Sequence, residues 1–135
     1  LGNNISTKNS QFKKNDFVTA LIKFSDNSIA KISSNFGSCA PHHHILNIYG
    51  TKKTFMHNLR ENIFYSSRNP DKKEYSIDNK KFYNNKKIIL ESFIKSFHSK
   101  KQPMVTKKDV FISMAVGLAI EKSVKNNKWV NIKNI

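Results

Sequence analysis

The sequence is poor in cysteine, in acidic residues and in long apolar runs, and each shortage excludes a class of protein. Cys39 is the one cysteine of 135 residues, which excludes an intrachain disulfide and leaves no CxxC pair for metal or redox chemistry. A lone thiol fits a reducing compartment, so we expect the cytoplasm. No apolar run approaches the length of about 18 residues that a membrane span needs, and the N-terminus lacks the apolar core of a signal peptide. We expect no membrane partner.

Acidic residues are also scarce, with 9 Asp and Glu against 24 Lys and Arg and a formal net charge of +15. Such a charge attracts the phosphates of nucleic acids. However, only Arg60 and Arg68 are arginines, and arginine is the residue that bidentate phosphate and guanine contacts favour. We therefore interpret the scattered lysines as a solvated surface. A small basic nucleic-acid-binding module stays as the alternative, motivated by aromatic residues that lie among the lysines: Phe64, Tyr65, Tyr75, Phe82 and Tyr83.

The length of the chain suits one domain with a two-layer core and is too short for a cofactor domain beside a substrate domain. Residues 1–15 are polar and have no apolar period, so we expect a linker or a truncated lead-in. Residues 16–135 are expected to form a single domain.

The first half of that domain has the alternating pattern of β-strands. Two runs rich in Val, Ile, Thr and Phe flank Asp26 and Asn27, a pair that predicts a two-residue hairpin with positive φ. The connections are too short for crossover helices, so the strands should be largely antiparallel. A polar excursion over residues 67–78 is expected to carry a further short strand. The expected strands cover residues 16–24, 28–36, 43–49, 53–57, 62–66 and 74–77.

The second half has a helical period. From Lys86, the residues Ile89, Phe93 and Phe97 fall on one stripe, which predicts an amphipathic helix with this stripe in the core. Residues 100–103 should end it.

A second helix is expected over residues 107–125, where Thr106 and Asp109 resemble a capping box. Its apolar residues cover more than one stripe, so it should be the most buried helix, with close packing around Gly117. A strand is expected at residues 129–132. Together these elements predict an α+β fold: a largely antiparallel, open-faced sheet with two C-terminal helices packed on one face.

Three segments carry a resemblance to a known family. They are FVTALIKFSDNSIAKI (17–32), NIYGTKKTF (47–55) and the paired-helix ending with its terminal strand (91–132). In this order they resemble the C-terminal domain of the glucose-fructose oxidoreductase, inositol dehydrogenase and MocA (Gfo/Idh/MocA) family. That resemblance implies a fold like the C-terminal domains of dihydrodipicolinate reductase and glyceraldehyde-3-phosphate dehydrogenase. Asn27 and Lys53 depart from the family, which has glycine at the corresponding turn positions.

The resemblance also implies a function. The family transfers hydride between NAD or NADP and a sugar, nucleotide sugar or cyclic polyol. Its dinucleotide-binding GxGxxG, its Glu-Lys-Pro segment and its Asp-x-x-x-His motif have no match here, so the N-terminal Rossmann domain is expected to be absent. No catalytic or cofactor-binding residue can be assigned, and the fragment alone is expected to be inactive and to bind no cofactor. The domain would line the substrate pocket and form a homo-oligomer through its open sheet face.

The histidine run His42, His43 and His44 is the most chemically suggestive motif. At a strand entrance, His42 and His44 can share one face while His43 takes the other. A metal site would need more Cys, His or carboxylate ligands than Cys39 and His57 nearby, so we expect none. These three histidines are therefore candidates for contact with a substrate hydroxyl, weighed against ordinary exposed or interface histidines.

Overall fold

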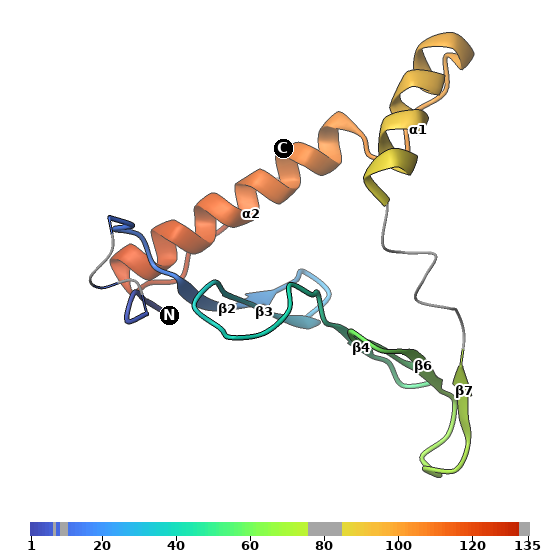
Figure 1. Ribbon diagram of the computed structural model, residues 1–135, viewed down its shortest axis with the longest axis horizontal. Helices are drawn as coiled ribbons and strands as arrows, with labels where there is room; N and C mark the ends of the chain where they lie inside the picture. The colour runs from blue at the N-terminus through green and yellow to red at the C-terminus, as the bar shows by residue number, and fades with distance from the viewer. Residues whose placement is uncertain (7, 9–10, 76–84, 133–135) are drawn as a thin grey trace. The chain divides into compact units, whose positions relative to one another are not determined.

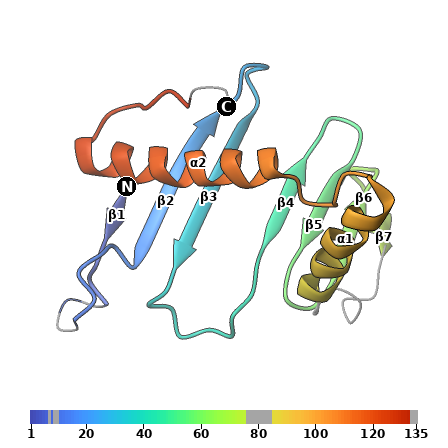
Figure 2. The same ribbon diagram turned by 90° about the horizontal axis from the view of Figure 1, so that it is seen from above.

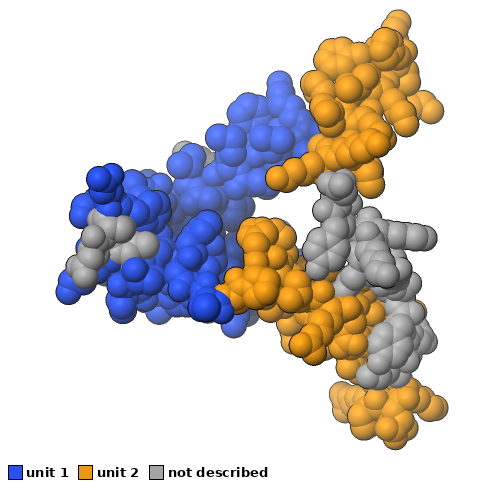
Figure 3. Space-filling model, viewed as in Figure 1, with its two compact units in different colours: residues 1–39, 105–135 blue, residues 40–104 orange. Residues whose placement is uncertain are grey.

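The chain folds into antiparallel strands followed by two helices, as a computed structural model shows for residues 1–6, 8, 11–75 and 85–132 (Figure 1). This arrangement confirms the predicted α+β class. The chain divides into two units, Leu1–Cys39 with Val105–Ile135 and Ala40–Met104, which Figure 3 distinguishes by colour. None of the helices in the described ranges is long and apolar enough to cross a membrane.

The first unit is built on a three-stranded antiparallel sheet, sheet A, with the order β1-β2-β3. β2 (Phe17–Lys23) and β3 (Ile29–Asn35) pair along their whole length, from Phe17 opposite Asn35 to Lys23 opposite Ile29. Both strands lie one residue inside their predicted bounds at each end. Valine, isoleucine and threonine favour this extended, half-covered conformation.

The turn between β2 and β3 differs from the prediction. Asn27 has a φ of 67°, but Asp26 is not among the described residues with positive φ. Asn27 N donates to Phe24 O and Phe24 N donates to Ser28 O, both at 3.0 Å, so the loop spans Ser25 to Asn27. The prediction of a two-residue hairpin is therefore wrong. The observed loop has three residues, a type I turn followed by one left-handed residue, and it needs positive φ only at Asn27.

The two faces of sheet A differ in exposure. Cross-strand partners share a face, so Val18, Ala20 and Ile22 of β2 lie on one side, and all three are half-buried. Leu21 and Ile29 lie on the opposite side and are 61% and 70% exposed. Figure 2 shows α2 (Lys107–Asn126) crossing sheet A. Sheet A thus has one side with half-buried apolar residues and one open side.

The sequence predicts a linker or a truncated lead-in for residues 1–15, but part of this segment forms a strand. β1 (Gly2–Asn3) pairs with β2, and Leu1 N donates to Thr19 O at 2.9 Å. Asp16, 1% exposed, fixes this segment: its Oδ2 accepts from Ser6 Oγ at 2.7 Å. Because a polar segment can satisfy a strand edge through its backbone alone, apolar periodicity could not reveal β1.

α2 has the predicted capping box at its start. Thr106 Oγ1 accepts from Asp109 N at 3.2 Å, and Asp109 Oδ2 accepts from Thr106 N at 2.8 Å. The helix ends where Asn127 adopts a φ of 51°. Near this end, Lys14 Nζ and Glu121 Oε1 are 3.6 Å apart. Both helix ends thus follow from local capping chemistry.

The predicted deep burial of α2 was wrong. None of its residues is buried, and a single stripe is half-buried: Ala115, Val116, Ala119, Ile120, Ser123 and Val124. A Cβ added at Gly117 would meet no atom within 4 Å, so no close neighbour explains that glycine. Residues 129–132 form no strand, and Trp129 is 79% exposed. The helical spacing of apolar residues is typical of a helix that packs along one stripe, as α2 does. In the described part of the chain, the further apolar residues of α2 pack against no second element and stay exposed.

The second unit contains a four-stranded antiparallel sheet, sheet B, with the order β4-β5-β6-β7. Its strands are β4 (Leu46–Tyr49), β5 (Thr54–His57), β6 (Asn62–Tyr65) and β7 (Lys73–Tyr75). β4 starts three residues later than predicted, because His43 and His44 stay in the preceding loop. The strand predicted at 74–77 begins one residue earlier, and residues 76–77 lie outside the described ranges.

The turn between β4 and β5 depends on Gly50. Gly50 N donates to Lys53 O at 3.0 Å, and a Cβ at Gly50 would lie 2.8 Å from that oxygen. Gly50 is therefore required for close approach and not for positive φ. Lys53 has no positive φ, so a side chain in place of the family's second glycine causes no backbone strain.

α1 (Asn85–Ser99) has the predicted start, within one residue, and ends where Lys100 adopts a φ of 55°. Its apolar stripe does not form a core in the structure: Ile89, Phe93 and Phe97 are 41%, 50% and 71% exposed. The rings of Phe93 and Phe97 contact each other at 5.0 Å between centroids. The helix is amphipathic, as predicted, with its apolar side exposed.

The α2 cap predicts an acid-sensitive helix. Hydrogen bonds from Thr106 lower the pKa of Asp109 below its ordinary value of 3.8. The stabilising effect of this carboxylate is therefore complete above pH 3.8 and is lost as the pH falls through the lowered folded-state pKa. Asp109→Asn should remove the part of the acid-induced loss of helical circular dichroism that protonation of Asp109 causes. Asp71→Asn, in an exposed turn, should leave the acid-induced loss unchanged. Thr106→Ala should cost about 1 kcal/mol of unfolding free energy at neutral pH. Identical acid profiles for wild type and Asp109→Asn would contradict this account.

Candidate functional site

The candidate site lies at one end of sheet B, which we call the His57 end. In the antiparallel register, Leu46 of β4 pairs with His57 of β5, and His57 pairs with Asn62 of β6. The segment that leads into β4 therefore reaches the sheet at the end where the β5–β6 turn closes (Figure 2). This topology brings the predicted histidine run and His57 to the same end of the sheet.

The histidine run forms an exposed loop with local contacts. The rings of His42 and His44 meet edge to face with centroids 5.1 Å apart, and His43 Nδ1 lies 2.6 Å from Pro41 O. A carbonyl oxygen only accepts, so His43 Nδ1 carries the proton. His42 and His44 contact each other within this loop, and not on one face of the strand that was predicted to start at His43. Their predicted role in substrate contact stays a prediction, since all three side chains are exposed.

His57 and Asn62 form the best-defined polar side-chain pair at this end. His57 Nδ1 lies 2.6 Å from Asn62 Oδ1. Asn62 is 5% exposed, whereas His57 is half-buried. Since the amide oxygen only accepts, Nδ1 of His57 carries the proton and Nε2 is the acceptor of the neutral ring. The pair thus fixes both the tautomer and the orientation of the imidazole.

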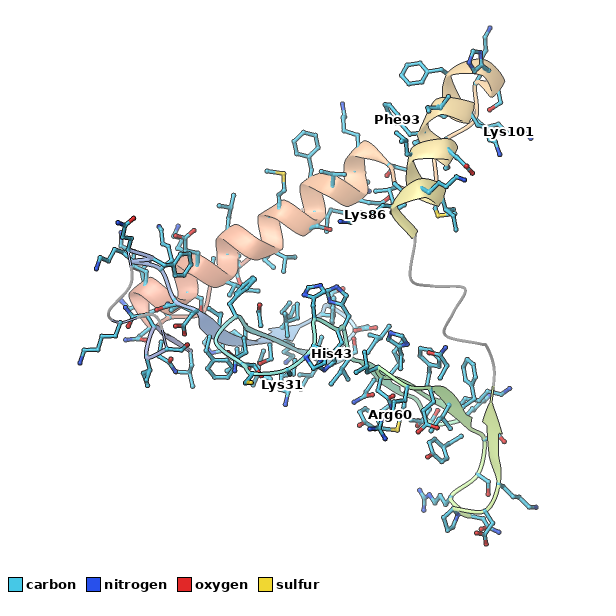
Figure 4. The ribbon with its side chains drawn as sticks, viewed as in Figure 1. Lys31, His43, Arg60, Lys86, Phe93 and Lys101 are labelled. Carbon is cyan, nitrogen blue, oxygen red and sulfur yellow. The ribbon has the colours of Figure 1, made fainter. Side chains whose placement is uncertain are left out.

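A short polar turn holds these two residues. Asn58 Oδ1 accepts from Arg60 N at 2.8 Å and from Glu61 N at 3.1 Å, and Asn58 N donates to Glu61 O at 3.1 Å. An asparagine side chain that bonds the backbone two residues onward stabilises such a turn. Figure 4 labels Arg60, an exposed residue of this turn, and His43 of the histidine run. The turn provides a rigid end to the β5–β6 hairpin.

Besides polar residues, the sheet face that carries His57 has aromatic and aliphatic residues on β4, β5 and β6. Phe55 and Phe64 are cross-strand partners with ring centroids 4.7 Å apart, and both are half-buried. Leu46 and Ile48 lie on the same face and are 51% and 54% exposed. Alternation places His57, Leu46 and Asn62 on this face as well. An oriented imidazole therefore borders a partly open aromatic and aliphatic surface.

The arrangement suits binding better than covalent or metal chemistry. Across the described ranges, no group of three or more His, Cys, Asp or Glu side chains could hold a metal ion. Cys39 is a free, exposed cysteine. The His57 end offers His57 Nε2 as an acceptor of fixed direction, the polar groups of the β5–β6 turn, and the apolar residues of the sheet face. Such a combination orients a ligand through few polar contacts and much apolar area.

Sequence reasoning named His57 only as a weak metal ligand and missed its partner. The signal was local: a histidine ends one predicted strand, an asparagine begins the next, and four residues separate them. That spacing makes the two residues cross-strand neighbours once the hairpin closes.

One comparison with known proteins gave a match. The model of the oxidoreductase family (Gfo/Idh/MocA), C-terminal alpha/beta domain, matches residues 2–132. No curated protein and no solved structure matches the chain. The match covers nearly the whole chain, including β1.

Different stability costs are expected for the two groups of polar residues. Asn62→Ala leaves the His57 Nδ1–H without its acceptor in a half-buried place, so it should lower the unfolding free energy by about 1–3 kcal/mol. His44→Ala removes an exposed ring and should change it by less than about 0.5 kcal/mol. Urea unfolding of both variants measures the difference. Equal losses for the two substitutions would mean that the His57–Asn62 pair does not stabilise the hairpin.

Proposed function

This chain belongs to the Gfo/Idh/MocA oxidoreductase family as its C-terminal alpha/beta domain, and we propose that it binds substrate for an NAD(P)-dependent oxidoreductase. The substrate class is a sugar, nucleotide sugar or cyclic polyol. The family match over residues 2–132 carries the proposal. The polar and apolar composition of the His57 end supports it.

The residues of this chain do not fit the nicotinamide cofactor themselves. A dinucleotide site needs closely spaced glycines at a strand-to-helix turn, where the backbone approaches the pyrophosphate. The glycines here are Gly2, Gly37, Gly50 and Gly117, too far apart for G-x-G-x-x-G. We therefore assign cofactor binding to a separate domain of the enzyme.

The contribution of the chain is to bind and orient the substrate. The His57 face of sheet B offers apolar area from Leu46, Ile48, Phe55 and Phe64, which would exclude water from one side of a bound ring. Polar groups at the end of the hairpin would fix the orientation of that ring. Orientation of this kind supports hydride transfer because the reacting carbon must face the nicotinamide.

The proposal includes self-association and location. Leu21 and Ile29 are exposed on the open side of sheet A, and apolar surface of this kind is typical of interfaces. We propose that this side forms a homo-oligomer. The single cysteine supports a reducing cytoplasm as the compartment.

The division of labour between domains can be tested with cofactor titrations. The 135-residue chain alone should neither quench nor enhance NADH or NADPH fluorescence and should oxidise no polyol. The longer protein that carries this domain should bind one of the two cofactors. Tight cofactor binding by the 135-residue chain would contradict the assignment. Affinity for DNA or RNA that falls steeply with salt would favour the basic-module alternative instead.

A further inference from the structure

The His57–Asn62 pair has a geometry that hairpin stability alone does not require. Asn62, a residue that is 5% exposed, uses its amide oxygen to hold one edge of the imidazole. The other edge of the ring carries Nε2, an acceptor whose direction is then fixed. His57 is half-buried, so part of the residue is exposed to solvent.

The orientation of His57 is set before any ligand arrives. β5 and β6 pair at four positions, from Thr54 opposite Tyr65 to His57 opposite Asn62. The Asn58 side chain closes the turn with two hydrogen bonds to backbone N–H groups. A group held by a paired strand and a closed turn loses little freedom on binding, which increases affinity.

An aromatic surface lies beside this acceptor on the same face. Phe55 precedes His57 by two residues on β5, so their Cα atoms are separated by about 7 Å along the strand. Phe55 and Phe64 form a tilted ring pair with an interplanar angle of 38°. Leu46 and Ile48 extend the apolar surface on the neighbouring strand and are about half exposed.

These features select a ligand chemistry. An imidazole acceptor of fixed direction takes a hydrogen bond from a hydroxyl group, and an aromatic pair packs on the C–H face of a saturated ring. A cyclic polyol or a pyranose carries both features in one molecule. We infer that the His57 face of sheet B is a specificity surface for such a ring, with His57 Nε2 accepting from one ring hydroxyl and Phe55 and Phe64 packing on its C–H face. This inference rests on the proposed function and deepens it.

The first test examines the imidazole in the 135-residue chain without ligand. Nitrogen-15 NMR of the ring at neutral pH should give a protonated, pyrrole-type Nδ1 and an unprotonated, pyridine-type Nε2 for His57. The Asn62→Ala variant should lose this preference. A protonated Nε2 in the wild-type chain would overturn the inference whatever the enzyme's substrate is.

The second test separates the two ring nitrogens in the longer protein that carries this domain. Turnover with NAD or NADP is measured on myo-inositol, D-glucose and D-xylose as probes. His57→Asn keeps a donor at the position of Nδ1 but removes the acceptor at Nε2, so KM for the accepted probe should rise on the order of tenfold with kcat nearly unchanged. His57→Gln restores an acceptor near the position of Nε2 and should recover most of the loss. His98→Asn, at the exposed end of α1, is the matched control and should leave both constants unchanged.

The outcomes distinguish this inference from the proposed function. If the unsubstituted protein turns over a probe but His57→Asn leaves KM unchanged, the inference is wrong and the proposed function stands. If the unsubstituted protein binds neither cofactor and turns over none of the probes, the proposed function fails and the inference fails with it. If KM rises equally in His57→Asn and His57→Gln while the urea midpoints stay unchanged, His57 does not act as an acceptor for the substrate.

Discussion

The antiparallel register of β4, β5 and β6 is the constraint on which the candidate site depends. It places Leu46, His57 and Asn62 in one cross-strand row, and Ile48, Phe55 and Phe64 in the row two residues further along, on the same face. A slip of one residue would move each of these side chains to the opposite face. The register is fixed by two short turns, one that needs Gly50 for close approach and one closed by the Asn58 side chain. Turn chemistry therefore decides which face carries the imidazole.

A second constraint is the small amount of apolar burial. Over the described ranges, Ile63 at 6% exposure is the one buried apolar side chain, while α1 and the first half of α2 expose most of theirs. Backbone pairing and local caps define the strands and helices, but they leave large apolar faces open. Contiguous exposed apolar surface is typical of binding and assembly sites. This agrees with a domain that works against a substrate and other protein surfaces, as the proposed function requires.

Local rules in the sequence predicted much of the fold. Alternation located the paired strands, and the Thr106–Asp109 pair predicted the start of α2, because both signals act within a few residues. Features that depend on distant partners were missed or wrong. β1 joins β2 through backbone groups that any residue carries. Residues 129–132 have the composition of a strand, but they form no strand in the described structure. His57 and Asn62 were separately visible, but their pairing depends on the turn between them.

The central claim is that the β5–β6 hairpin of sheet B contacts the substrate of an oxidoreductase. Hydrogen–deuterium exchange of the proposed full-length enzyme, with the proposed cofactor and with or without a saturating polyol, tests it most directly. The account predicts that the polyol slows amide exchange in residues 54–65 more than in residues 17–35 of sheet A. Unchanged exchange in residues 54–65, together with slower exchange elsewhere in the protein, would contradict it.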